Sequence, residues 1–237
     1  MTVDERPGPD SSLVGHAVGS ITRLMRDNDL MPGDRLPSES ELARQLQVSR
    51  TVVREAFRSL AAMRIIELAT GRRATVARID HGPMSLMMEH GVQTEQINIQ
   101  QIYDVRRTIE MRIATLAALR RTGAEAQALS AEAAGLRAAV QDPARMMRHD
   151  LAFHAILAEA SRNPVYALII GSFRGVTSET WAIGWRSRST PEARERMLVN
   201  HERIAAAVAE GDPEAASAAM SDHFDESVRA LIVAGLS

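Results

Sequence analysis

The chain has 237 residues, which is long for one hydrophobic core and comfortable for two. It contains no cysteine, so disulfides and thiolate metal sites are excluded, and any metal must be held by imidazole and carboxylate groups. No apolar stretch approaches the roughly 20 residues that cross a bilayer, and the polar start MTVDERPGPDSS lacks the apolar core of a signal peptide. We therefore expect a cytoplasmic protein with no membrane partner.

The formal net charge of −2 is unevenly distributed along the chain. Residues 1–78 hold 12 Arg against 10 acidic residues, whereas residues 79–237 hold 16 Arg against 20 acidic residues. Within residues 49–78, seven Arg stand against Glu55 and Glu67 alone. Such a basic segment is typical of a surface that meets phosphates, although a solvated basic face would have the same composition.

The N-terminal part predicts a helix over 13–28 after twelve residues that we expect to be disordered. A short helix follows, because Ser38 and Glu41 have the spacing of a capping box. Ser49 is a favourable N-cap for another helix that runs through Leu60. Residues 64–78 then show two short β-rich runs around a Thr-Gly-Arg-Arg turn, which predicts a hairpin.

Two short helices joined by a tight turn, with arginines early in the second, favour a DNA-reading unit. Arg50 and Arg54 lie one helical turn apart and so share a face, from which guanidinium groups can bind guanine in the major groove. Ser49 and Thr51 can reach phosphates, and the Gly-Arg-Arg tip of the hairpin can meet the DNA backbone or minor groove. The alternative is a helical hairpin with ordinary surface arginines.

The rest of the chain is predicted to be helical. Asp142, Asn163, Thr190 and Asp212 each precede a proline, and proline is tolerated at the first position of a helix. Residues 79–96 look like a connector with a short helix at 84–90. The predicted helices are 97–121, 124–141, 143–162, 164–187, 191–210 and 212–234.

Four side chains of this helical half suit a metal ion. Asp150 and His154 are four residues apart on one helical face, and His201 and His223 each lie on an apolar face of a later helix. One such histidine is more often an ordinary core residue than a ligand, but three with a carboxylate favour a site. Three imidazoles and one carboxylate suit Zn²⁺, and also Ni²⁺ or Mn²⁺.

A buried charge is predicted beside them. Arg106 falls on the apolar face formed by Ile102, Val105, Ile109, Ile113 and Leu116. A buried arginine needs a partner, which is either Glu110 one turn away or an anionic ligand such as a carboxylate. Trp181 and Arg174 lie on one side of their helix with Thr177 and Trp185, and could line the cavity of such a ligand. Core or dimer surface is the alternative for the tryptophans.

The run GDRLPSESELARQLQVSRTVVREAFRSLAAMRIIEL, followed by TGRRATVAR, resembles the winged helix-turn-helix DNA-binding domain of the GntR family of transcription regulators. The matching positions are Leu36, Pro37, Ser38, Glu39, Leu42, Ala43, Val48, Ser49, Arg50, Arg54, Glu55, Ala56 and Leu60. The resemblance implies that Ser49, Arg50, Thr51 and Arg54 contact operator DNA and that Gly71 belongs to the tip of the wing. Ser38, Arg72 and Arg73 are further candidates for DNA contact. Ser40 and Arg73 depart from the residues usual in the family, so the preferred operator differs from its common one.

The helical half is similar to the FCD ligand-binding domain of the FadR branch of this family. The similarity lies in DVRRTIE, then D-x-x-F-H before Asn163-Pro164, then H-x-x-I-x-x-A, and finally His223. It implies that Asp150, His154, His201 and His223 hold a divalent metal, frequently zinc, and that Arg106 binds an organic acid. Arg174 and Trp181 are the further candidates for that acid.

The sequence thus predicts a mainly α protein of two domains, a winged helix-turn-helix at 13–78 and a bundle of about six helices at 97–237, joined by a linker at 79–96. We expect a homodimeric repressor on a palindromic duplex, controlled by a sugar acid, a hydroxy acid or a dicarboxylate. The alternatives are a regulator whose effector is the metal itself and a metal-dependent enzyme.

Overall fold

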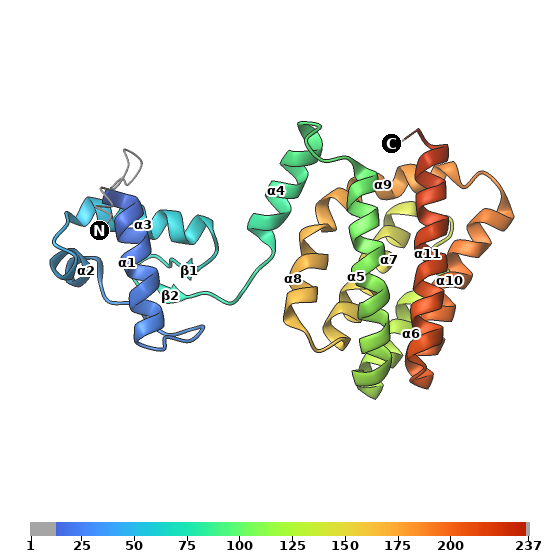
Figure 1. Cartoon of the computed structure of the whole chain (residues 1–237), viewed down its shortest axis with the longest axis horizontal. Helices are drawn as coiled ribbons and strands as arrows, with labels where there is room; N and C mark the ends of the chain where they lie inside the picture. Colours follow the sequence, from blue (N-terminus) through green and yellow to red (C-terminus); the bar gives the residue numbers. More distant parts are fainter. Residues whose placement is uncertain (1–12, 236–237) are drawn as a thin grey trace, which may run out of the picture. The chain divides into compact units, whose positions relative to one another are not determined.

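The protein is described here by a computed structural model covering residues 13–235 (Figure 1). The N-terminal segment 1–12, predicted to be disordered, lies outside the described residues. The chain divides into two compact units, with the boundary between Pro83 and Met84. Within the described range, no helix is both long and apolar enough to span a membrane.

The first unit is a small helical domain closed by a two-stranded sheet. Its elements are α1 (Leu13–Asp27), α2 (Glu39–Gln45), α3 (Arg50–Ala62), β1 (Ile66–Glu67) and β2 (Thr75–Val76). The strands are antiparallel, with Ile66 opposite Val76, and Gly71 adopts a φ of 71° between them. α1 and α2 both pack on α3, and Ile21, Leu42 and Phe57 are buried in the core between these helices.

Capping chemistry fixes where the two short helices begin. The Ser38 hydroxyl accepts from the Glu41 amide, and the Ser38 amide donates to the Glu41 carboxylate at 2.7 Å, so the predicted capping box is present. The Ser49 hydroxyl accepts from the Val52 amide at 3.3 Å at the start of α3. Gln47 takes a left-handed φ of 54°, which lets the chain turn sharply between the helices.

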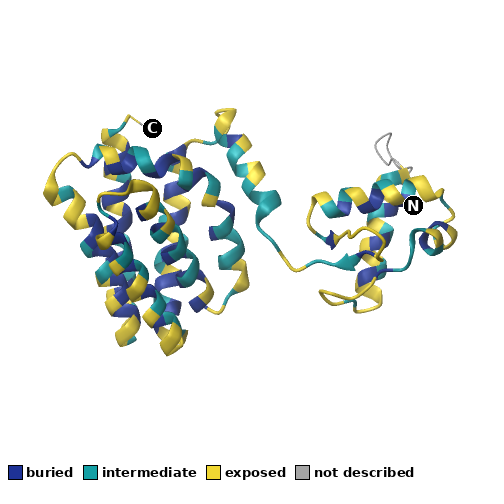
Figure 2. Ribbon diagram, turned by 180° about the vertical axis from the view of Figure 1, so that it is seen from behind, coloured by how far each residue is buried: buried dark blue, intermediate teal, exposed yellow. Residues whose placement is uncertain are grey.

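The second unit is an all-helical bundle in which α5 is packed against α7, α10 and α11 (Figures 1 and 2). Buried positions run along the inner faces of the bundle helices in Figure 2, so the core lies between them. The helices are α4 (Gly82–Gln93), α5 (Ile99–Arg120), α6 (Gly123–Ala138), α7 (Pro143–Ala160), α8 (Pro164–Ser172), α9 (Arg174–Ser187), α10 (Pro191–Glu210) and α11 (Pro213–Val233).

The proline-led helix starts are confirmed, because the side chains of Asp142, Asn163, Thr190 and Asp212 each accept a backbone hydrogen bond of the following turn. The single helix predicted over 164–187 is wrong. The chain breaks at Phe173, where the backbone forms a tighter bond from the Phe173 amide to the Ile170 carbonyl and the Ser172 hydroxyl donates to the Ile169 carbonyl.

The apolar face predicted for α5 also differs. Val105 is 46 % exposed, and the buried stripe instead runs through Ile102, Arg106, Glu110 and Ile113. The helix is therefore rotated so that a charged pair, rather than a valine, faces the centre of the bundle.

Candidate functional site

Three histidines from three helices meet in the centre of the second unit. His154 comes from α7, His201 from α10 and His223 from α11, and one ring nitrogen of each lies within 4.8 Å of the others. All three side chains are buried, with exposed fractions of 5 % or less. The bundle thus brings together the three imidazoles singled out in the sequence, at a separation suited to one ion.

Hydrogen bonds leave imidazole nitrogens available for coordination. Nδ1 of His154 contacts the Glu110 carboxylate, so this nitrogen carries the proton. Nε2 of His154 and Nδ1 of His223 are buried and have no hydrogen-bond partner among the described residues. Buried polar atoms are normally satisfied, so two orphan nitrogens in one cluster fit a metal ion as their partner.

Asp150 lies at the edge of the same cluster. Its Oδ1 is 3.0 Å from Nε2 of His201, whose Nδ1 is 2.8 Å from the Met197 carbonyl oxygen. Since a carbonyl only accepts, Nδ1 carries a proton, and in the neutral ring Nε2 points a lone pair at the carboxylate. The Nε2 lone pair and the carboxylate oxygen would repel each other. Something positive must therefore lie between them, either a metal ion or a second proton. The three histidines form a group that could hold a divalent ion, and Asp150 lies beside this group through its contact with His201.

The electrostatics of the site favour neutral imidazole and ionised carboxylate. Burial, with the adjacent His201 and His154, holds the pKa of His223 well below its usual range. Burial alone would raise the pKa of Asp150, but the His201 hydrogen bond and the neighbouring histidines bring it below its usual range. Both groups are therefore in the protonation state that binds metal at neutral pH.

Arg106 is buried beside the histidines and is paired. Its Nε donates to Glu110 at 2.8 Å and its Nη1 donates to the Thr177 hydroxyl at 3.0 Å. Burial opposes the charge, yet Glu110 and nearby groups keep the pKa of Arg106 above its usual value. Glu110, one of the two partners predicted for Arg106, therefore pairs with it. The guanidinium of Arg106 also lines a cavity.

That cavity reaches from Arg106 to His154 and His223 of the histidine cluster. Its free space is small, about 30 Å³. Trp181 lines it, whereas Trp185 stacks on Trp181 and packs in a separate core cluster. The lining residues are Tyr103, Arg106, Asp150, His154, Thr177, Thr180, Trp181, Gly184, Arg188, Met197, His223, Phe224, Ser227 and Leu231. Arg174, the other predicted effector residue, is exposed at the start of α9 and is not among them.

The predicted DNA-contacting residues lie on the surface of the first unit. Ser49, Arg50, Thr51, Arg54, Gly71, Arg72 and Arg73 are exposed. Ser38 is half-buried and its hydroxyl is used as a helix cap. The guanidinium of Arg54 donates to Glu39 at 3.2 Å, and that of Arg73 lies 3.6 Å from Glu41. Carboxylates of α2 therefore hold two of these arginines in the free protein.

Comparison with known proteins supports both halves. Residues 13–76 match the model of bacterial regulatory proteins of the gntR family, and residues 101–226 match the FCD domain. The chain belongs to the GntR family. Regulators of this family are transcription factors rather than enzymes, and they bind operator DNA and small-molecule effectors.

Relatives and solved structures of the GntR family resemble the chain over most of its length. It is 30 % identical to the HTH-type transcriptional regulator LutR of Bacillus subtilis, over 85 % of this chain and 93 % of the relative. It is 28 % identical to the Galactonate operon transcriptional repressor of Escherichia coli, over 85 % and 89 %. A GntR structure from Streptococcus agalactiae superposes with a TM-score of 0.65 at 26 % identity, covering 91 % of this chain and 98 % of that one.

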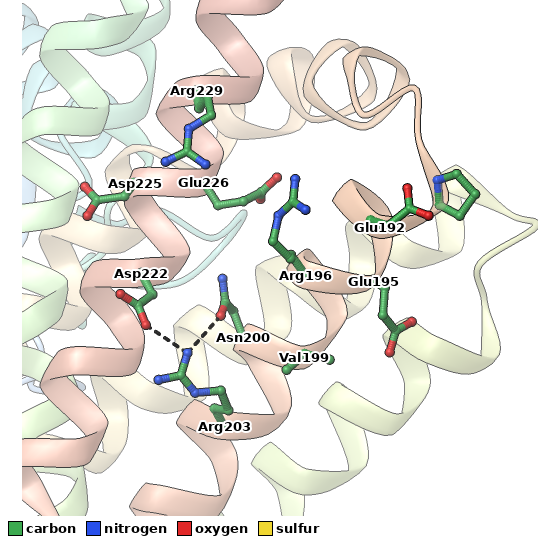
Figure 3. Close-up of a pocket in the computed structure, with 11 residues that line it drawn as sticks. Glu192, Glu195, Arg196, Val199, Asn200, Arg203, Asp222, Asp225, Glu226 and Arg229 are labelled. Carbon is green, nitrogen blue, oxygen red and sulfur yellow. Dashed lines mark hydrogen bonds and ion pairs between the residues drawn. The ribbon is translucent and has the colours of Figure 1, made fainter.

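A larger pocket of this GntR-family chain lies between α10 and α11 (Figure 3). It has a volume of about 840 Å³ and is open to solvent. Arg203 bridges Asn200 and Asp222 at 3.3 and 2.8 Å, as the dashed lines in Figure 3 show. The lining has five acidic side chains against three arginines, so its charge disfavours an anion, in contrast to the small cavity around Arg106.

Sequence reasoning missed a second buried ion pair, whose arginine lines the small cavity around Arg106. Arg188 is buried and donates to Glu226 through Nε and Nη2 at 2.8 to 3.1 Å, and its Nη1 donates to the Gly184 carbonyl. It also missed that Glu110 contacts His154 as well as Arg106. No spacing rule links residues on different helices, so only the packed bundle reveals these contacts.

Proposed function

We propose that this GntR-family regulator binds a divalent metal, foremost zinc, and a small organic acid in the cavity of its FCD domain, and that the acid changes its affinity for operator DNA. The observation that carries the proposal is that Arg106, His154 and His223 line one cavity, and that both histidines belong to the three-histidine group. A guanidinium can bind a carboxylate in a bidentate fork, and a metal can take a further oxygen of the same molecule. The metal would supply Lewis acidity and charge for holding the acid.

The name of the galactonate repressor relative supports a sugar acid as the effector class, and repression is the direction of control that we propose. Thr177, Thr180 and Ser227 line the cavity and can bond to hydroxyl groups of such a molecule. On DNA, we propose that Arg50 and Arg54 read bases from α3, while Arg72 and Arg73 meet the backbone from the hairpin. One short helix reads few bases, so a homodimer on a palindromic duplex in the cytoplasm is the proposed working form.

The test is operator binding by the full-length zinc-loaded protein, on a duplex selected from random sequence, with galactonate, lactate and succinate as probes. We expect one acid class to lower operator affinity by about 5–150-fold, the range of typical coupling between sites. The same acid should raise the free energy of unfolding by about 2.7 kcal/mol at a hundredfold excess over its Kd. Tighter operator binding with acid would reverse the proposed direction of control.

Arg106→Lys separates the clamp from the rest of the site, because an ammonium cannot make the two parallel bonds of a guanidinium. We expect this variant to bind operator as the wild type does and to lose most of the response to acid. The matched control is Arg174→Lys, an exposed arginine outside the cavity, which should respond normally. A normal response in Arg106→Lys would leave Arg106 with Glu110 as a structural pair only.

A second candidate is a regulator whose effector is the ion itself. The observation in its favour is the small free volume of about 30 Å³, which admits an ion without moving any side chain. Titration of zinc without acid distinguishes the two: a metal sensor would change operator affinity with zinc alone, whereas the proposed acid-responsive regulator requires the acid.

A further inference from the structure

One carboxylate of the bundle contacts both the arginine and the histidine cluster. Oε1 of Glu110 accepts from Nε of Arg106 at 2.8 Å on the same helix, and Oε2 accepts from Nδ1 of His154 on α7. The Glu110 side chain is 1 % exposed, so water cannot readily replace either partner. Any substitution of Glu110 must therefore alter the surroundings of both Arg106 and His154.

Toward the histidines, Glu110 selects the ring form that a metal ligand needs. An ionised carboxylate only accepts, so Nδ1 of His154 must carry the proton and Nε2 must present its lone pair. That Nε2 is the atom without a hydrogen-bond partner within residues 13–235, and His154 belongs to the three-histidine group. A carboxylate behind a metal-binding histidine fixes its tautomer and orientation in this way.

Toward the cavity, the same carboxylate sets the plane of the guanidinium. Glu110 engages Nε and Thr177 engages Nη1, which uses two of the five N–H groups of Arg106. The rings of Tyr103 and Phe224 lie on the guanidinium at 5.4 and 5.3 Å from its carbon. The guanidinium is held in place before any ligand arrives, with N–H groups left for a carboxylate.

The charges of the cavity leave room for one negative charge on the ligand. Arg106 and Glu110 cancel, as do Arg188 and Glu226. The buried Asp150 carboxylate would then neutralise one of the two positive charges of a divalent ion. One positive charge would remain, and a buried charge without compensation is costly. A monocarboxylate completes the balance, whereas a dicarboxylate exceeds it.

Resting on the proposed metal and acid site, we propose that Glu110 is the positioning residue that orients both His154 for the metal and Arg106 for the acid, and whose charge makes the cavity select a monoanionic carboxylate. It touches neither ligand itself. It acts through the two side chains that do.

Glu110→Gln tests the first half of this proposal. The amide has one acceptor and one donor where the carboxylate has two acceptors, so it can satisfy only one of the two N–H groups. We expect the full-length variant to bind Zn²⁺ about 10–100-fold more weakly in competition with a chelator, the usual loss when an outer-shell partner is removed. The matched control is Glu132→Gln, which changes a carboxylate that contacts His149 of α7 outside the histidine cluster and should keep wild-type zinc affinity.

The second half is tested by lactate against malonate, a monoanion and a dianion, measured by calorimetry on the zinc-loaded proteins. Wild type should prefer lactate, and Glu110→Gln should shift the ratio of affinities toward malonate, because one negative charge of the cavity is gone. A merely structural role for Glu110 would weaken both acids alike and leave the ratio unchanged, which would overturn this half.

A variant that keeps the core intact guards against misfolding. Arg106→Gln combined with Glu110→Gln removes both charges together, and replacing a whole buried pair is tolerated better than breaking it. It should lose zinc affinity as the single variant does. Equal zinc binding by wild type and either variant would overturn the positioning role while leaving the proposed metal site in place. A wild-type protein that binds no zinc would overturn the proposed function, and this inference with it.

Discussion

The two units place their functional side chains in opposite environments. In the first, Arg50 and Arg54 are exposed neighbours on α3 and contribute nothing to its core. In the second, Arg106, His201 and His223 are nearly or fully buried on three different helices. The proposed DNA-reading surface should therefore be changeable without loss of fold. The proposed ligand site is part of the core, so its occupancy and the stability of the bundle should be coupled.

The largest expected effect comes from His201→Ala, since this side chain is fully buried in the cluster. Purified wild type should carry roughly one divalent ion per chain, and the variant almost none, with helical content largely intact because the bundle has its own apolar faces. Chelation should lower the Tm of wild type and not of the variant. Metal analysis and circular dichroism measure both.

The matched control is His149→Ala, because His149 is on the same helix as His154 but pairs with Glu132 outside the cluster. It should keep its metal. Full metal occupancy in an Asp150→Ala, His201→Ala double variant would place the ion elsewhere and remove the contrast between the two units.

A smaller effect, confined to DNA, is expected in the first unit. Arg50→Ala should weaken operator binding by about 1–3 kcal/mol and relax discrimination at one base pair per half-site. Its Tm should equal that of wild type, because Arg50 is exposed. Arg26→Ala, an exposed arginine of α1, is the control and should bind operator normally. Anisotropy titrations would count against the DNA-reading assignment of α3 if both variants bound alike.

The smallest effect is a pH dependence of the metal-free bundle. The pKa of His223 lies well below its usual value in the folded protein, so between the two values the unfolded chain binds more protons. Stability therefore falls as the pH drops below about 6.5, by at most about 1.4 kcal/mol per pH unit.

Urea unfolding between pH 7.5 and pH 5.5 isolates this contribution, because the lowered pKa of Asp150 affects stability only in more acidic solution. His223→Gln should flatten the dependence, and His90→Gln, which changes an exposed histidine, should not. An unchanged slope in His223→Gln would assign the titration to another group.

The parts of the fold that could be predicted from sequence are those that local chemistry decides. Ser38, Ser49 and the four residues before proline satisfy amides within their own first turn, so helix starts were readable. The break at Phe173 was not, because the nearby Gly171 and Gly175 both lie within helices, and the break depends instead on one tightened backbone bond and a buried serine. The rotation that exposes Val105 depends on the neighbours of α5, which no single helix encodes.

The same division holds for the candidate site. Histidines and an arginine on apolar faces stand out by periodicity, and the bundle does bring His154, His201, His223 and Arg106 into one place. The double contact of Glu110 and the Arg188–Glu226 pair arise between helices far apart in the sequence. Arg174 does share α9 with Thr177 and Trp181, as the spacing predicts, but it is exposed at the first residue of that helix and does not line the small cavity.

Glu39 and Glu41 of α2 pair with Arg54 and Arg73, and these pairs affect how the protein distinguishes its operator from the rest of a genome. If these arginines meet DNA, each must exchange a built-in counterion for a phosphate, and Glu39 and Glu41 then remain close to a negatively charged duplex. That repulsion does not depend on the DNA sequence, so it weakens binding to the vast excess of random sites. At a true operator, base contacts restore the lost affinity. Because an internal carboxylate already neutralises the arginine, fewer salt ions should be displaced than the number of phosphate contacts suggests, giving a shallower dependence of affinity on salt.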